Sequence, residues 1–95
     1  ALNASAISKD MAAGIIDWFN FLNKKTDVFF GYAVIEDGRG EGEIITSAGW
    51  RLKVGLTENI DLQFAELQHL LVKEKINFNS LNYIDLRYLG KVYWQ

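Results

Sequence analysis

The residue types that could support catalysis are present in this chain, but their spacing matches no catalytic motif. Ser47 and Ser80 both lie in turn-like segments, and neither belongs to the G-x-S-x-G sequence that exposes a nucleophilic serine. Glu41 and Glu43 form a pair of carboxylates in a polar, glycine-rich segment, where we expect no burial that would make one an acid and the other a base. These patterns predict a non-catalytic domain.

Metal, cofactor and phosphate sites are not predicted either. His69 is the only histidine and lies among polar positions of a predicted helix, and the chain has no cysteine, so we expect neither a metal nor a cofactor. The glycine-rich segment at residues 38–42 precedes a strand rather than a helix, and it lacks the spacing of a phosphate-binding loop. We therefore expect it to form the tip of a β-hairpin.

Composition and charge predict a globular domain that does not bind nucleic acid. Of the 95 residues, 49% are hydrophobic and 23% are charged, which is far from the pattern of a disordered chain. The net charge is −2 and the cations are spread along the chain, so no basic surface for a phosphate backbone is predicted. No apolar run reaches the roughly 20 residues that span a bilayer, so we expect any membrane anchor to lie outside this chain.

The strongest candidates for binding chemistry lie near the C-terminal end of the sequence. Val92, Tyr93 and Trp94 lie in a short predicted strand, and aromatic residues are enriched at the centres of protein interfaces. We expect this strand at a sheet edge, where unpaired N–H and C=O groups can bind another strand. Arg87 could bind a partner's carboxylate through two parallel hydrogen bonds. Two alternatives stay open: Asp85 and Arg87 could be the solvated side of a half-buried strand, and Trp94 could pack in the core.

Hydrophobic periodicity predicts the elements that position these residues, beginning with a helix over residues 9–25. Its apolar stripe repeats at helical spacing and consists of Met11, Ile15, Phe19 and Leu22, with Ile16 and Trp18 widening it. Residues 28–36 are rich in β-branched and aromatic side chains and predict a strand. A turn at residues 37–42 and a second strand at residues 43–47 complete a predicted β-hairpin.

The next segments predict a third strand and a second helix. In residues 50–54 apolar and charged side chains alternate, so Trp50 is expected in the core and Arg51 in solvent. Residues 58–74 predict a helix, capped by Thr57 or Asn59. Its apolar stripe consists of Ile60, Phe64, Leu67 and Leu71, and its outward positions are Gln63, Glu66, Gln68 and Lys73.

Residues 81–88 and 92–95 predict the last two strands, joined by a turn in which Gly90 supplies a positive φ. The order is therefore α-β-β-β-α-β-β in a single domain over residues 1–95. The helix between the third and fourth strands is a crossover, so we expect these two strands to be parallel with a right-handed connection, and the other pairs to be antiparallel. We predict an α+β fold: a mixed sheet of about five strands with both helices packed on one face.

Two segments have sequences that resemble those of a known family. The first is Tyr-Ile-Asp-Leu-Arg-Tyr at residues 83–88, followed by Gly90 and a short strand, which resembles the C-terminal signature of the β-domain in the FtsQ/DivIB family of bacterial cell-division proteins. Ala-Gly-Trp-Arg-Leu-Lys-Val-Gly at residues 48–55 resembles the strand that precedes the last long helix of the family. The spacing between the two segments also fits, and the resemblance extends over roughly residues 9–95.

The resemblance implies a binding module of the divisome, the assembly that builds the division septum. Family members are single-pass membrane proteins whose extracytoplasmic part, outside the bacterial inner membrane, carries a polypeptide-transport-associated domain and then this β-domain. The β-domain acts as a scaffold and binds the C-terminal region of a coiled-coil partner of the FtsB/DivIC type, itself joined to an FtsL-type partner. The partner pairs as an added strand with the last strand of the sheet. The residues implied or predicted to bind it are Arg87, Tyr88, Lys91, Val92, Tyr93 and Trp94.

A second class of function would fit the same architecture. Similar α+β domains bind small ligands or regulate an enzyme to which they are attached, because one fold can carry many functions. A deep apolar pocket with convergent polar groups would favour this alternative.

Overall fold

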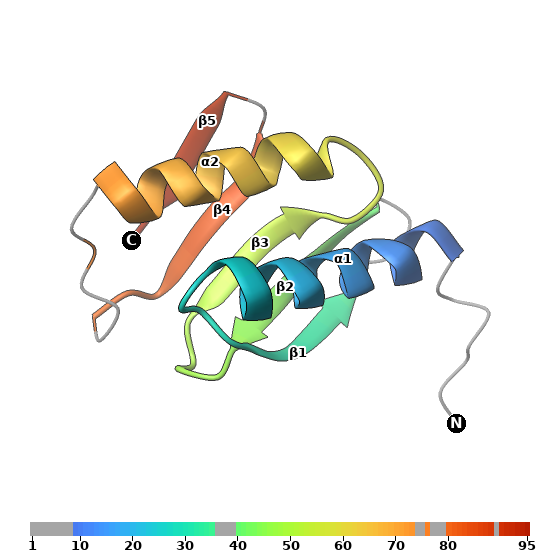
Figure 1. Cartoon of the computed structure of the whole chain (residues 1–95), viewed down its shortest axis with the longest axis horizontal. Helices are drawn as coiled ribbons and strands as arrows, with labels where there is room; N and C mark the ends of the chain where they lie inside the picture. The colour runs from blue at the N-terminus through green and yellow to red at the C-terminus, as the bar shows by residue number, and fades with distance from the viewer. Residues whose placement is uncertain (1–8, 36–39, 74–75, 77–79, 89) are drawn as a thin grey trace.

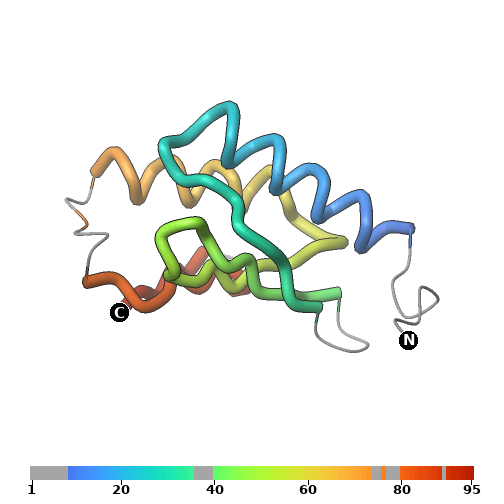
Figure 2. Tube along the Cα trace, turned by 90° about the horizontal axis from the view of Figure 1, so that it is seen from below, coloured from blue at the N-terminus to red at the C-terminus, as the bar shows by residue number. Residues whose placement is uncertain are grey.

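The computed structural model describes residues 9–35, 40–73, 76, 80–88 and 90–95, and these have the predicted order α-β-β-β-α-β-β. In chain order the elements are α1 (Lys9–Lys25), β1 (Phe30–Ile35), β2 (Glu41–Thr46), β3 (Arg51–Gly55), α2 (Ile60–Lys73), β4 (Tyr83–Tyr88) and β5 (Lys91–Trp94). Both helices lie on one face of the sheet, as Figure 1 and Figure 2 show. The predicted α+β fold is therefore confirmed.

The five strands form one mixed sheet whose order follows the chain, β1-β2-β3-β4-β5. β3 and β4 are parallel, and the other neighbouring pairs are antiparallel, as predicted. α2 supplies the long crossover that a parallel pair requires, because a tight turn can join only antiparallel strands. One row of paired residues crosses the sheet on the face that the helices leave open: Val34, Glu43, Lys53, Asp85 and Tyr93.

Several element boundaries differ from the predicted ones. β2 begins at Glu41, inside the predicted turn, because the backbone of Gly42 already pairs with both neighbouring strands. β4 begins at Tyr83 rather than at residue 81. β5 follows directly after Gly90, whose φ of 76° is the positive value expected for this turn. The predicted strand end at residue 36, most of the predicted turn that follows it and the predicted helix end at residue 74 lie outside the described residues.

The buried face of α1 is rotated relative to the predicted stripe. Trp18 is 0% exposed and lies in the core, whereas Phe19 is 46% exposed and packs edge-on against Phe30, with 5.4 Å between the ring centres. The prediction that Phe19 belongs to the buried stripe is therefore wrong. Gly14 explains the rotation, because its missing side chain lets α1 approach the backbone of Leu56 more closely than any other residue would allow.

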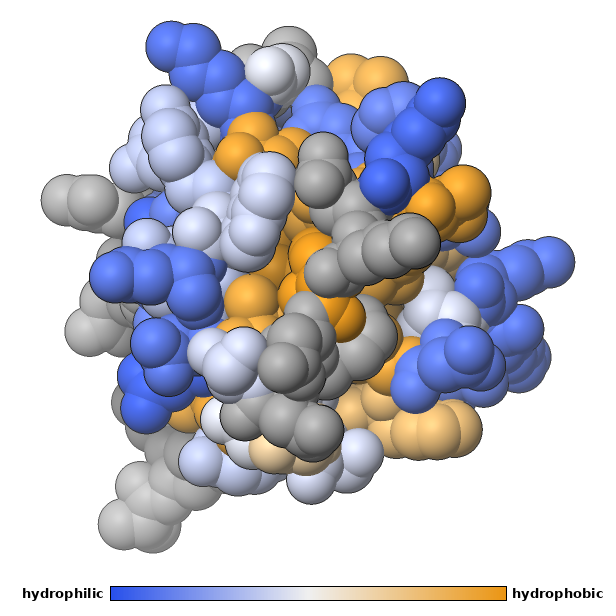
Figure 3. All heavy atoms as spheres, turned by 90° about the vertical axis from the view of Figure 1, so that its left-hand side faces the viewer, coloured by the Kyte–Doolittle hydropathy of each residue, from blue (hydrophilic) through white to orange (hydrophobic). Residues whose placement is uncertain are grey.

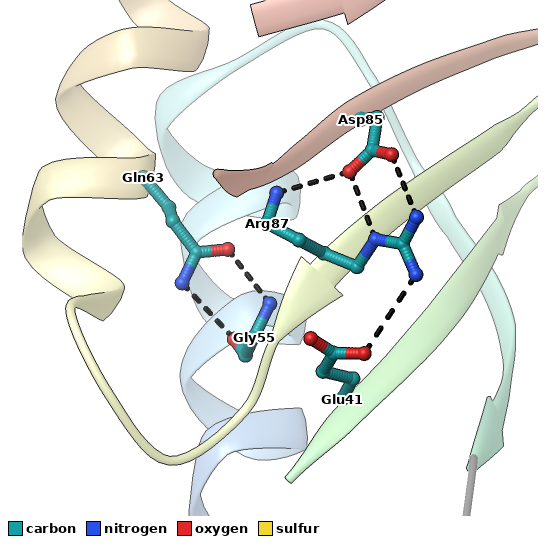
Figure 4. Close-up of polar contacts among 5 residues, drawn as sticks. All are labelled: Glu41, Gly55, Gln63, Asp85 and Arg87. Atoms are coloured by element: carbon teal, nitrogen blue, oxygen red, sulfur yellow. Dashed lines mark hydrogen bonds and ion pairs between the residues drawn. The ribbon is translucent and has the colours of Figure 1, made fainter. Parts of the chain in front are cut away.

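Gln63 is a second correction, because the sequence predicts it on the outward side of α2 but it is only 5% exposed. Its Oε1 accepts a hydrogen bond from Gly55 N at 2.8 Å, and its Nε2 donates to Gly55 O at 3.2 Å (Figure 4). Nε2 also donates to Glu58 O at 3.1 Å. These bonds satisfy the amide in the interior, which is the condition for burying a polar side chain without a large cost.

Both helices are attached to the same strand end, which we call the Gly55–Leu56 junction. From α1, Trp18 Nε1 donates a hydrogen bond to Gly55 O at 3.2 Å, and Gly14 packs against Leu56. From α2, Gln63 holds both backbone groups of Gly55. The end of β3 therefore sets the position of the whole helix layer over the sheet.

Candidate partner-binding edge

β5 is the terminal strand of the described sheet, and half of its backbone groups point away from β4. Gln95 N donates to Tyr83 O at 3.2 Å and Tyr83 N donates to Gln95 O at 3.3 Å, so Gln95 turns its backbone groups toward β4. In an antiparallel pair the residues alternate between facing the partner strand and facing away from it. The N–H and C=O groups of Val92 and Trp94 therefore point outward from the sheet, toward the side where no described strand lies.

The opposite edge strand, β1, is less available for pairing with another strand. Its register shifts between Phe30 and Tyr32, and such a bulge interrupts the regular row of groups that another strand would need. The N–H of Phe30 is already bound, because it donates to Asn23 Oδ1 of α1 at 3.2 Å. Of the two edges, β5 is therefore the better template for an added strand.

The side chains around β5 place apolar surface on both faces of this edge. Tyr93 lies on the open face and packs edge-on against Tyr88, with 6.1 Å between the ring centres. Trp94 pairs with Ile84, a core residue, so it lies on the helix side of the sheet. All three aromatic side chains are exposed, between 43% for Trp94 and 52% for Tyr88, so packing of Trp94 wholly within the core is ruled out.

Arg87 lies in β4 beside this surface, but its guanidinium group is already occupied within the chain. Nε donates to Asp85 Oδ1 at 3.0 Å and Nη2 donates to Asp85 Oδ2 at 2.8 Å, while Nη1 lies 3.7 Å from Glu41 Oε1 (Figure 4). The bidentate geometry expected toward a partner's carboxylate is thus made with Asp85. A direct role of Arg87 in partner binding stays a prediction.

The Asp85–Arg87 pair also shapes the strand next to the edge. Asp85 Oδ1 accepts a hydrogen bond from Arg87 N at 3.0 Å, where the register between β4 and β5 shifts. Asp85 lies on the open face, as the alternation predicts, but it is only 6% exposed rather than solvated. Burial by itself raises the pKa of Asp85, yet the hydrogen bonds from Arg87 outweigh it and hold the pKa below its usual range. The same hydrogen bonds raise the pKa of Arg87.

Asp85→Asn will lower the free energy of unfolding by about 2 kcal/mol at pH 7, because Arg87 loses its charged partner in a nearly buried position. The stabilisation from a carboxylate whose folded pKa is lowered is fully present above its unfolded pKa of about 4 and is lost as the pH falls through the folded value. The wild type should therefore lose stability steeply below about pH 4, and Asp85→Asn should lose less. Urea unfolding at pH 7, 4 and 3 measures both effects.

Asp17→Asn is the matched control, because Asp17 is exposed in the middle of α1 and the substitution changes the charge by the same amount. It should leave the stability at pH 7 within about 0.5 kcal/mol of the wild type. If Asp85→Asn behaves like Asp17→Asn at every pH, the pair does not stabilise the edge.

The charges in the middle of the open face are paired within the chain. Arg51 Nη1 lies 3.4 Å from Glu43 Oε2, and Lys53 Nζ lies 4.6 Å from the ring centre of Tyr83. As predicted, Arg51 is exposed and Trp50 is buried in the core. Both cations in the centre of the open face thus already contact other side chains of the chain, and the exposed apolar side chains lie toward the sheet margins.

A groove runs between α2 and β5 on the helix side of the sheet, directly beside the edge. It has a volume of about 440 Å³ and is open to solvent. α2 contributes a stripe at helical spacing, and the lining residues are Leu62, Ala65, Glu66, His69, Leu70, Lys73, Gly90, Val92 and Trp94. A strand added to β5 would direct every second side chain into this groove.

Glu66 is a residue of this site that sequence reasoning misses. It is expected among the outward positions of α2, but its Oε1 accepts a hydrogen bond from Gly90 N at 3.1 Å, so it reaches the turn before β5. Its Oε2 is buried and has no hydrogen-bond partner among the described residues. No sequence pattern signals this contact, because the two residues are 24 positions apart and meet only through the tertiary fold.

A second groove lies between the C-terminal ends of the two helices. It has a volume of about 480 Å³ and is lined by Lys25, Thr26, Asp27, Val28, Gln68, Leu71 and Val72. On this side of the molecule, hydrophobic residues gather in the centre and hydrophilic residues surround them (Figure 3). Nothing in the structure indicates what would bind there.

His69 is exposed on α2, and the described residues contain no group of three or more potential metal ligands. None of the described helices combines the length and the apolar character needed to cross a membrane.

In comparisons with known proteins, no family model matches the chain, and no curated protein matches it significantly. Any proposal for the function of this chain therefore rests mainly on the geometry of the β5 edge.

Proposed function

We propose that this chain is a non-catalytic protein-binding domain that takes up a strand of a partner protein at β5. The observation that carries the proposal is the outward direction of the backbone groups of Val92 and Trp94 on the terminal strand of the sheet. Main-chain hydrogen bonds to these groups would supply affinity, and the groove on one face and the Tyr88–Tyr93 pair on the other would select the side chains.

The identity of the partner is proposed from the resemblance to the FtsQ/DivIB family. The two segments of this chain that resemble the family form β3 and β4, which are neighbours in the sheet, and β4 leads into β5 through a short turn. In this proposal the chain is a divisome scaffold domain on the extracytoplasmic side of the bacterial inner membrane, held by an anchor outside this chain. Its partners are of the FtsB/DivIC type, joined to an FtsL-type protein.

Small-ligand binding has less support than strand addition. The two grooves beside α2 are open to solvent, whereas small-ligand sites enclose most of the ligand surface. A third hollow, which we call the polar cleft, has Glu41, Glu58, Gln63, Glu66 and Arg87 among its lining residues. Its volume is small, at about 170 Å³. These shapes favour an extended peptide over a compact molecule.

The test is an NMR titration of the ¹⁵N-labelled domain with the C-terminal segment of the FtsB/DivIC-type protein from the same genome. We expect saturable amide shifts concentrated between Arg87 and Trp94. Trp94→Ala and Tyr88→Ala should each weaken binding about tenfold, because truncating a central aromatic residue of an interface typically costs more than 1 kcal/mol.

Tyr32→Ala is the matched control, because Tyr32 is 59% exposed on β1, the other edge of the sheet. It should leave the affinity unchanged, and all three variants should keep the wild-type unfolding midpoint within a few degrees. Saturable shifts confined to β1, or equal losses with Tyr32→Ala and Trp94→Ala, would contradict binding at β5.

A further inference from the structure

The orphaned oxygen of Glu66 indicates what kind of side chain the partner strand carries; this inference rests on the proposed function. Oε1 of Glu66 is held by the N–H of Gly90, at the turn where β5 begins. Oε2 is buried and has no hydrogen-bond partner among the described residues. A buried carboxylate oxygen without a partner is costly, so a donor supplied on binding would be favoured there.

The charge around Glu66 calls for a cationic donor. Glu66 lies at the border between the groove beside β5 and the polar cleft, which is also lined by Glu41 and Glu58. The one cation among the described lining residues of the cleft is Arg87. Asp85 binds its guanidinium group in a bidentate manner, and Nη1 lies 3.7 Å from Glu41 Oε1, so this cation is already paired. The cleft therefore carries excess negative charge at its junction with the groove.

The register of the sheet gives the position of this cation in the partner strand. Val92 and Trp94 turn their side chains to the helix side, and so does any residue that pairs directly with them in an added strand. These two partner residues enter the apolar part of the groove, which Leu62, Ala65 and Leu70 line from α2. The next partner residue on the same side lies about 6.8 Å further along, opposite Gly90 and beside Glu66.

We infer that the β5 edge selects an extended segment with two apolar residues and one lysine or arginine at alternate positions, the basic residue lying at the Glu66 end. For an antiparallel partner strand the pattern is apolar-x-apolar-x-basic, and for a parallel strand it is the reverse. The ammonium or guanidinium group donates a charge-assisted hydrogen bond to the carboxylate of Glu66. The groove thus fixes the register of the partner through Val92 and Trp94 and its direction through Glu66.

The test uses three peptides that differ only at the basic position. The first is acetyl-Thr-Val-Thr-Val-Thr-Lys-Thr-amide, and the other two have norleucine or glutamate in place of lysine. Norleucine keeps most of the aliphatic stem and removes the charge. In NMR titrations of the whole chain, the lysine peptide should bind about tenfold more tightly than the norleucine peptide and more tightly still than the glutamate peptide.

Glu66→Gln should remove this preference, because the amide keeps an oxygen for Gly90 N–H but no longer attracts a cation. Asp61→Asn is the matched control: it removes one carboxylate from the same helix but outside the groove, so the tenfold preference should persist. A lysine preference that survives Glu66→Gln, or equal binding of the lysine and norleucine peptides at β5, would overturn the role of Glu66 but leave strand addition at β5 intact. Absence of shifts at β5 with all three peptides and with the FtsB/DivIC-type segment overturns strand addition as well.

Discussion

Alanine in place of Gly14 will lower the free energy of unfolding by about 3 kcal/mol, although alanine is the better helix former. A Cβ atom at this position would fall on the carbonyl oxygen of Leu56 and lie 2.8 Å from its carbonyl carbon. These are backbone atoms at the Gly55–Leu56 junction, so they cannot rotate away as a flexible side chain could. α1 would have to lift from the sheet, and urea unfolding followed by far-ultraviolet circular dichroism will measure the loss.

Ala13→Val is the matched control for Gly14→Ala. Ala13 is the neighbouring residue of α1 and is exposed, so a larger side chain there meets solvent. The only expected effect is the weaker helix propensity of valine, so the free energy of unfolding should fall by less than about 1 kcal/mol. Equal stability of Gly14→Ala and the wild type would show that α1 does not pack this closely on the junction.

Trp18→Ala will lower the free energy of unfolding by about 4 kcal/mol, a large share of the 5–15 kcal/mol that holds a typical domain together. The indole is fully buried and packs edge-on against the rings of Phe64 and Phe21, whose centres lie 4.7 Å and 6.0 Å from its own. Gly55 O also loses the hydrogen bond that the indole Nε1 donates to it. The same urea experiment measures this variant, with circular dichroism as the probe because the fluorescence signal itself changes.

Phe19→Ala distinguishes the observed face of α1 from the stripe that periodicity predicts. Phe19 is the next residue in the helix and also aromatic, but it is half-exposed at the β1 margin. Its removal should cost only about 1 kcal/mol, so the two adjacent alanine variants should differ severalfold. Similar losses for both would mean that the predicted stripe, and not the observed one, faces the core.

The element order was predictable because strand alternation and helical spacing are local signals that the tertiary structure did not override. The rotation of α1 was not, because apolar residues occur on two sides of this helix, at Ile15, Ile16 and Phe19 as well as at Trp18 and Phe21. What decides between the two sides is the close approach at Gly14, which depends on a backbone carbonyl 42 positions later in the chain, at Leu56. Periodicity contains no information about such a contact.

For the candidate site, sequence reasoning located the edge but not the groups that shape it. Alternation along β4 places Asp85 and Arg87 on one face, so their internal pairing was within reach of the sequence. Gln63 and Glu66 were both expected to face solvent because polar residues usually do. Their partners, Gly55 and Gly90, contribute backbone groups, and backbone groups leave no trace in a hydropathy pattern.

The agreement between sheet order and chain order has a consequence for how the domain forms during synthesis. Each strand pairs with the strand made just before it, so no early strand has to wait for a distant one, and most pairings close short loops. A chain emerging from the ribosome can extend its sheet one strand at a time, with the newest strand always at the growing margin. A strand contributed by another protein beside β5 would continue this series as its sixth member, by the same step that added the fifth.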